Sequence, residues 1–320
     1  MSATPASPPR RPRRWSTLLR WFDTDARSPA AAESADPDGH RIDWLRAIPF
    51  VGLHLACVAV IWVGVSWVAV AVAVLLYAVR MFAITAFYHR YFSHRTFHTS
   101  RVVQFLFALI GASSVQRGPL WWAAHHRNHH RHADQPLDPH SPREQGFWWS
   151  HMGWFLTREG FRTDWSRIPD LAKYPELRWL DRFDTLVPVA LAAALFGLGA
   201  LLQHVAPSLG TTGPQMLVWG FFVSTVVLFH ATVTINSLAH RFGKQRYDTG
   251  DDSRNNLWLA LLTFGEGWHN NHHFFPGTAR QGFRWYEVDI TWYGLRLMQA
   301  LRLVNGLKPV PAWVLAKARS

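Results

Sequence analysis

Residues 185–240 read TLVPVALAAALFGLGALLQHVAPSLGTTGPQMLVWGFFVSTVVLFHATVTINSLAH. These 56 residues include no Asp, Glu, Lys or Arg, and a second charge-free run extends from Ala47 to Val79. A bilayer span needs only about 20 apolar residues, and ordinary soluble domains do not carry charge-free runs of this length. The sequence therefore predicts an integral membrane protein.

Each run is long enough to fold back on itself once. The first continues past Arg80 to Tyr88, and as one helix at about 1.5 Å per residue it would be roughly twice as long as the hydrocarbon layer is thick. The simplest turn lies near Gly64–Ser66, and the second run breaks at the Pro- and Gly-rich segment Pro207–Pro214. We expect an all-α integral membrane fold with four transmembrane helices in two hairpins, at about 47–63, 67–88, 186–205 and 215–236.

Two hairpins place both termini and the long middle segment on one side of the membrane. Of the 33 Lys and Arg residues, 32 fall on that side, which the positive-inside rule makes cytoplasmic. We expect a multi-pass protein of the cell (inner) membrane with both termini and a helical cap in the cytoplasm. The net charge of +12 suits anionic lipid headgroups, and it is not gathered on one soluble module as in a nucleic-acid-binding protein.

The ends of the chain differ from its middle. Residues 1–40 are rich in Pro, Ala, Ser and Arg and are predicted to form a disordered basic tail. The membrane domain is expected at 41–310, followed by a C-terminal tail at 311–320. The short apolar segment 101–112 fits a re-entrant or interfacial helix better than a fifth span.

Histidines form the strongest chemical signal in the chain. Eighteen are present, and nine of them lie near the predicted cytoplasmic ends of helices: His89, His94, His126, His129, His130, His240, His269, His272 and His273. In each H-x-x-H-H group the three imidazoles share one helix face. His89 and His94 are about 140° apart on a regular helix, so they suit two ions or a helix that breaks between them. Asn236 lies one turn before His240.

Nine nitrogen donors are too many for one metal ion and about right for two. Imidazole suits Zn, Cu, Fe or Ni, and the single cysteine, Cys57, excludes a thiolate-closed zinc site. Iron with open positions for dioxygen is favoured, while spacing alone leaves zinc and copper open. The remaining histidines are interpreted as packing, loop, surface or supporting residues: His40, His54, His98, His125, His132, His140, His151, His204 and His230.

The boxes H-x4-H, H-x-x-H-H and H-x-x-H-H in a chain with four spans resemble those of the membrane fatty acid desaturases, most closely the bacterial acyl-CoA (stearoyl-CoA type, Δ9) desaturases. The resemblance covers about residues 45–305 and includes Asp138-Pro-His-Ser-Pro142, Asn236-Ser and Gly265-Glu-Gly. It implies two irons held by the nine histidines, with Asn236 acting through water. It also implies that O2 and two external electrons introduce a cis double bond into a saturated acyl chain.

The same resemblance implies a bent, apolar substrate tunnel. Tyr77 and Met81 would lie near its closed end, and Gln116, Trp122 and Thr232 would line the bend. Val233 stands where the family has a large aromatic residue, which bears on chain length and double-bond position. The carboxylates nearest the boxes, which we expect to support the ligands or to be surface or capping residues, are Asp134, Asp138 and Glu266. Arg80, in or near the second span, is expected either to serve the site or to snorkel to the surface.

Electrons must come from outside, because the sequence carries no motif for haem, an iron–sulfur cluster or a nucleotide. A ferredoxin or flavin reductase is implied as donor, and a fatty acyl-CoA or acyl-lipid as substrate. Two other functions share these features. One is a membrane di-iron hydroxylase of alkanes or other lipids, and the other is a metal-binding or transport protein without catalysis.

Overall fold

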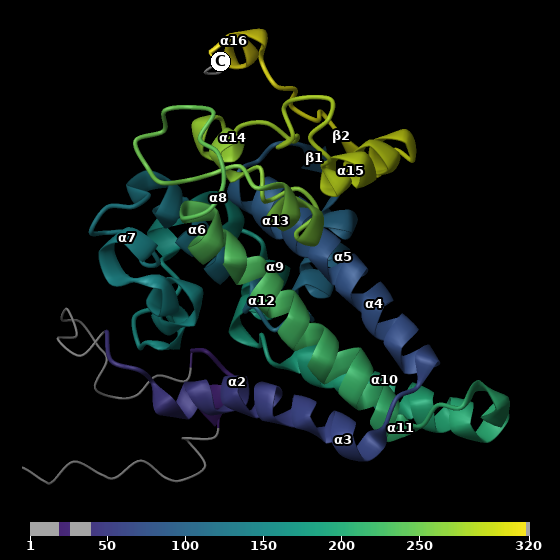
Figure 1. Cartoon of the computed structure of the whole chain (residues 1–320). Coiled ribbons are helices and arrows are strands. Elements are labelled where there is room, and N and C mark those ends of the chain that lie inside the picture. Colours follow the sequence, from purple (N-terminus) through teal and green to yellow (C-terminus); the bar gives the residue numbers. More distant parts are fainter. Residues whose placement is uncertain (1–18, 26–39, 318–320) are drawn as a thin grey trace, which may run out of the picture.

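The computed structural model describes residues 19–25 and 40–317. These residues are mainly helical, with two short strands, β1 (His98–Thr99) and β2 (Val304–Asn305), that pair antiparallel. Helices long and apolar enough to cross a bilayer cover Trp44–Val63, Trp67–Ser93, Leu186–Val205 and Gly213–His240. The prediction of a helical membrane protein with four spans is confirmed (Figure 1).

The first hairpin turns where the sequence predicts. Its first arm contains α2 (Trp44–Ala56), a short 3-10 segment and α3 (Val60–Val63), and its second arm begins with α4 (Trp67–Phe82). Gly64 between them has a φ of 68°, a left-handed conformation that costs glycine little. Ser66 then caps α4, since its side chain accepts from the Ala69 amide.

The second hairpin also breaks at the predicted segment. Its first arm is α10 (Leu186–Val205), and the connection contains a 3-10 turn at Pro207–Leu209. The second arm starts with α11 (Gly213–Gln215), continues as a π-helix over Met216–Val223 and ends with α12 (Ser224–Ser237) and a 3-10 turn at Leu238–His240. The ends of both hairpins, at α3 and α11, lie together at the end of the molecule away from α14 (Figure 1).

The second and fourth spans run further than predicted. The second continues from α4 as a π-helix, Ala83–Ser93, all of whose residues are buried. It ends at Ser93 and not at 88, because this segment is covered by the remaining helices, which we call the cap (residues 94–185 and 241–317). The spans thus deliver their last residues directly into the body of the cap.

The cap is built from short helices around the ends of the spans. Phe87 and Phe92 of the π-helix pack in one core with Leu120, Leu177 and Leu295. The helices of the cap are α5 (Arg101–Ala112), α6 (Pro119–His132), α7 (Pro142–Gln145), α8 (Pro169–Ala172), α9 (Pro175–Arg182), α13 (Leu257–Leu262), α14 (His269–Phe274), α15 (Ile290–Ala300) and α16 (Ala312–Ala316). Another π-helix covers Trp149–Gly153, and 3-10 turns cover Trp154–Leu156 and Trp165–Arg167.

Two segments assigned to the tails pack on this body. Leu19–Trp21 forms a 3-10 turn, and the Trp21 indole donates to the Leu45 carbonyl at 2.8 Å. At the other end, Val314 of α16 is fully buried against Tyr247 and Phe283. The indole hydrogen bond of Trp21 holds the first segment in place, and the buried side chain of Val314 holds the second. The rest of the tail predictions, 1–18, 26–39 and 318–320, falls outside the described residues.

Arg80 neither snorkels nor contacts the histidines. It is fully buried between the second and fourth spans, where its guanidinium donates to the Thr225 hydroxyl at 2.8 Å, to the Ser224 hydroxyl at 2.5 Å and to the Ser113 carbonyl at 3.3 Å. The expectation that it snorkels is therefore wrong, because neutral oxygens from Ser113 and from α12 satisfy the charge inside the bundle.

Candidate metal centre

The nine box histidines converge into two groups that could each hold a metal ion. The first group is His89, His94, His126, His130 and His272, and the second is His129, His240, His269 and His273. Within each group one nitrogen of every imidazole lies within 4.8 Å of the others. These residues come from two spans and two cap helices.

Each H-x-x-H-H box is divided between the two groups. In α6, His126 and His130 enter the first group and His129 enters the second. In α14 the division is reversed, since His269 and His273 enter the second group and His272 the first. Residues i and i+4 are about 40° apart around a helix, whereas i+3 lies on the other side of i. Each box can therefore face two ions at once.

The π-helix brings His89 and His94 into the same group. The His94 amide donates to the His89 carbonyl at 3.3 Å, the i to i−5 bond that defines this widened helix. The extra residue per turn aligns positions five apart, and the two ring centroids are 4.9 Å apart. Of the two arrangements left open by the spacing, the structure has the distorted helix.

Carboxylates hold several of the imidazoles by Nδ1. In the second group, His129 pairs with Asp138 at 2.9 Å, His240 with Asp134 at 2.8 Å and His273 with Asp251 at 2.8 Å. In the first group His89 pairs with Glu266. A carboxylate on Nδ1 orients the ring and leaves Nε2 to face a ligand.

The protonation states favour this arrangement. Burial alone would raise the pKa of Asp134, but the hydrogen bond and charge of His240, with donors from Asp252 and Ser141, outweigh it and lower that pKa. Burial and the neighbouring imidazoles lower the pKa of His130 and His272 well below the ordinary value. These rings are therefore neutral, as metal ligands must be.

The donor set fits a bound cation. His129 and His273 each have a carboxylate on Nδ1, so a ring that is neutral and gives its Nδ1 proton to that carboxylate has only a lone pair on Nε2. Those two Nε2 atoms face each other at 3.2 Å. Two lone pairs at this distance repel unless a positive ion lies beside them, so the geometry suits a metal held by imidazole.

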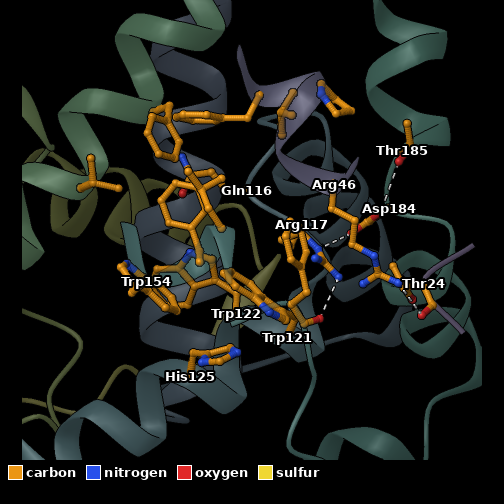
Figure 2. A pocket seen from close by; sticks show the side chains of 18 of the residues that line it. Thr24, Arg46, Gln116, Arg117, Trp121, Trp122, His125, Trp154, Asp184 and Thr185 are labelled. Atoms are coloured by element: carbon orange, nitrogen blue, oxygen red, sulfur yellow. Dashed lines mark hydrogen bonds and ion pairs between the residues drawn. The ribbon is translucent and has the colours of Figure 1, made fainter. Parts of the chain in front are cut away.

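A cavity adjoins the first group, since His126 lines it. It has a volume of about 220 Å³ and is lined largely by apolar side chains, together with Gln116, Trp122 and Thr232. Figure 2 shows Gln116 and the indoles of Trp122 and Trp154 on one side, and Arg46, Arg117 and Asp184 on the other. We call this space the apolar cavity. It is shaped to hold an apolar chain beside the imidazoles.

A smaller cavity of about 40 Å³ lies next to both histidine groups. Met81, Trp122, Thr232 and Asn236 line it together with His89, His126, His129 and His269. We call it the metal-side cavity. Gln116 and Thr232 hydrogen-bond at 3.0 Å, and Trp122 stacks on His126 with ring centroids 5.0 Å apart. Trp122, Thr232 and Asn236 line both cavities, so they lie at the junction.

Tyr77 does not line either cavity among the described residues. Its hydroxyl donates to the Leu262 carbonyl at 2.6 Å, and its ring packs with Met81, Leu228 and Phe264. It lies one helical turn before Met81, which does line the metal-side cavity.

Three histidines interpreted as packing residues form a chain of hydrogen bonds. His54 Nε2 lies 3.0 Å from His230 Nε2, His230 Nδ1 lies 3.0 Å from His151 Nε2, and His151 Nδ1 lies 2.9 Å from the Ser237 hydroxyl. The chain links the first and fourth spans to the cap. It gives His230 the partner that a polar group inside a span requires.

Sequence reasoning missed several supporting residues. Asp251 lies on a polar loop with no motif to mark it, and Gln281 donates to Glu266 at 3.0 Å from a loop after α14. Arg90 was passed over inside the first box, although it is fully buried and pairs with Glu266 at 3.1 Å and Asp289 at 2.9 Å. An arginine beside a histidine box in an otherwise apolar span was a usable signal.

His125 and His140 adjoin the centre without belonging to either of the two groups of box histidines, although His140 forms a further cluster with His129 and Asp138. His125 Nε2 donates to the Arg162 carbonyl at 3.0 Å, and the ring centroids of His140 and His129 are 4.4 Å apart. Burial lowers the pKa of His125 to about 4 and that of His140 to about 3. Both rings line the apolar cavity.

Comparisons with known proteins agree with these features. A family model described as fatty acid desaturase matches residues 65–302. An sn-1 stearoyl-lipid 9-desaturase of Anabaena variabilis is 40% identical over 67% of this chain and 74% of its own length. A palmitoyl-monogalactosyldiacylglycerol delta-7 desaturase of Arabidopsis thaliana is 40% identical over 66% of this chain and 54% of its own length. An acyl-CoA 5-desaturase of Anemone leveillei is 40% identical over 68% of this chain and 64% of its own length.

Proposed function

Because the chain belongs to the fatty acid desaturase family, we propose that it introduces a cis double bond at Δ9 into a saturated fatty acyl-CoA, using O2 and two external electrons at a di-iron centre. The observation that carries this proposal is the convergence of two histidine groups beside the junction of two cavities. In the reaction, two hydrogens from adjacent methylenes, together with two external electrons and two protons, reduce O2 to two molecules of water.

The ligands in this proposal are the nine box histidines, with Asn236 acting through water in the second group. Bound iron would supply the oxidising power that an unactivated methylene requires. The protein's own part is to hold the rings. Glu266 orients His89, and Asp134, Asp138 and Asp251 orient three rings of the second group.

Chain position decides which bond reacts, because a methylene offers no polar handle. The apolar cavity would hold the carboxyl half of the chain and the metal-side cavity the methyl end, with the reacting bond at their junction. The hydrogen bond between Gln116 and Thr232 and the stacked ring of Trp122 fix the wall there. Several relatives named 9-desaturases support the Δ9 position, and relatives named for positions 7 and 5 make it a matter for experiment.

A polar pocket of about 830 Å³ supports CoA as the acyl carrier. It shares Arg20, Thr24, Arg46 and Phe161 with the apolar cavity. It therefore adjoins the cavity that would hold the carboxyl half of the acyl chain. Three aspartates line it against six arginines: Arg20, Arg46, Arg158, Arg162, Arg178 and Arg182. We call it the arginine pocket. Guanidinium groups bind phosphate well, and the indoles of Trp165 and Trp179 offer faces for a purine.

The proposal includes a cytoplasmic centre in the cell membrane and a separate electron donor. The cap carries the basic residues that the positive-inside rule assigns to the cytoplasm. A ferredoxin or flavin reductase with an acidic surface would be steered to that face.

The test is product analysis with defined substrates. The chain is expressed in a host without its own desaturase, and saturated acyl chains are supplied. Mass spectrometry of the products then locates the new double bond. We expect a new cis double bond at Δ9, which begins at the ninth carbon when the carboxyl carbon is counted as the first. Hydroxylated chains without a new double bond would contradict desaturation. With purified protein, turnover of stearoyl-CoA but not of stearoyl phospholipid in vesicles is expected, and the reverse would contradict the CoA assignment.

A further inference from the structure

The carboxylates that contact the box histidines are divided unequally between the two groups. Three of the four imidazoles in the second group have a carboxylate on Nδ1, namely those paired with Asp134, Asp138 and Asp251. In the first group of five, His89 alone has such a partner among the described residues, namely Glu266. The two groups therefore offer a metal ion different electrostatic surroundings.

The single carboxylate of the first group is also partly neutralised. Glu266 accepts from the buried guanidinium of Arg90 at 3.1 Å and from the amide of Gln281 at 3.0 Å. The three aspartates of the second group accept instead from hydroxyls and backbone amides, such as Ser141 and the Asp252 amide on Asp134, and Thr249 and the Ser253 amide on Asp251. Their negative charge stays available to the ion.

Charge balance matters here because both groups are buried. Neutral imidazoles bring no charge, so a dication in either group must be compensated by its surroundings. A carboxylate that accepts the Nδ1 proton also makes that imidazole a better donor, and losing such a partner typically costs a site about 10- to 100-fold in metal affinity. Two additional carboxylates outweigh the one additional imidazole of the first group.

We propose that the two metal subsites are inequivalent: the second group, with Asp134, Asp138 and Asp251 behind it, binds a divalent ion more tightly and fills first. This rests on the proposed function only in requiring that both groups bind an ion. Asp134, Asp138 and Asp251 are thus positioning residues whose combined charge sets the order of loading.

The test is a metal titration of the purified, metal-free protein in detergent without oxygen. Cobalt(II) is the probe, because its visible absorption reports each occupied site, and bound metal is counted by mass spectrometry. We expect two steps, with the first ion bound at least about 100-fold more tightly than the second.

Asp251→Asn separates the two sites with little disturbance. The amide keeps an oxygen for the Thr249 hydroxyl and the Ser253 amide, and it replaces the charged oxygen that accepts from His273 Nδ1 by an NH2 group that cannot accept. We expect it to weaken the first step by about 10- to 100-fold and to leave the second unchanged. Glu266→Gln should weaken only the second step. Asp252→Asn is the matched control. Asp252 follows Asp251 on the same loop, but its side chain pairs with Arg143 of α7. Both binding steps should stay as in the wild type.

The outcomes separate the two proposals. Two ions bound with equal affinity, or an Asp251→Asn variant that weakens both steps alike, would overturn the inequivalence and leave the proposed function standing. A protein that binds no cobalt in either step would instead refute the metal centre itself.

Discussion

Met81 offers the sharpest test of how the protein measures its substrate. Its side chain is fully buried and lines the metal-side cavity with His89, His129 and His269. Met81→Ala removes the Cγ, Sδ and Cε atoms, which leaves room for about two more methylenes at the methyl end of the chain. At about 0.8 kcal/mol for each buried methylene, this is about 1.6 kcal/mol. The ratio of kcat/KM for a chain two carbons longer should therefore rise about 15-fold.

The assay is competition between saturated acyl chains of the preferred length and of two carbons more, with products separated by mass spectrometry. Met216→Ala is the matched control, because Met216 is equally buried in a span but packs with Ala69, Leu195 and Phe221 away from the histidines. The control should lose stability and keep the wild-type profile. An unchanged profile in Met81→Ala, at wild-type metal content, would refute the assignment of this wall.

Three further variants test other parts of the molecule. His272→Ala removes a ring whose Nε2 lies 2.9 Å from the Nε2 atoms of both His89 and His130. The variant should lose activity and about half of the bound metal while still inserting in the membrane. The control His98→Ala, at an exposed position, should keep both activity and metal. Arg178→Ala, in the arginine pocket, should raise the KM for stearoyl-CoA about tenfold with kcat unchanged. The control Arg296→Ala, at an exposed position, should leave this KM unchanged. Equal KM values in the two variants would argue against the arginine pocket as the CoA site. Burial raises the pKa of Asp181 to about 6, so the folded state holds this proton more tightly than the unfolded state, and stability falls as pH rises from about 4 to about 6. Asp181→Asn stays neutral and should gain up to about 3 kcal/mol at pH 8 and about half as much at pH 5, as measured by thermal denaturation; a gain independent of pH would contradict this.

The spans and the nature of the centre could be predicted from local sequence. Charge-free runs reveal helices because a bilayer tolerates no unpaired charge on its lipid face. Gly64 and the segment Pro207–Pro214 mark the turns through backbone preferences that act within a few residues. The histidine boxes show their chemistry in the same way, because residues one turn apart on a helix share a face.

Packing changed the picture wherever a residue's partner lies far away in the chain. Arg80 was expected to need water or the site, but α5 and α12 supply three oxygens to it. Tyr77 and Met81 were both placed near the end of the tunnel, and in the structure Tyr77 packs against the cluster of Met81, which itself lines the metal-side cavity. Spacing along one helix contains no information about what the neighbouring helix presents.

The sequence by itself determined four apolar spans and nine imidazoles grouped at helical spacing, because length, charge and helical period are local properties. Only the tertiary structure decided how those imidazoles divide into five and four, and which carboxylates stand behind them. Asp251 reaches His273 from another loop, and such a contact exists only once distant segments have packed. The widened turn that joins His89 and His94 likewise forms where the cap encloses the helix.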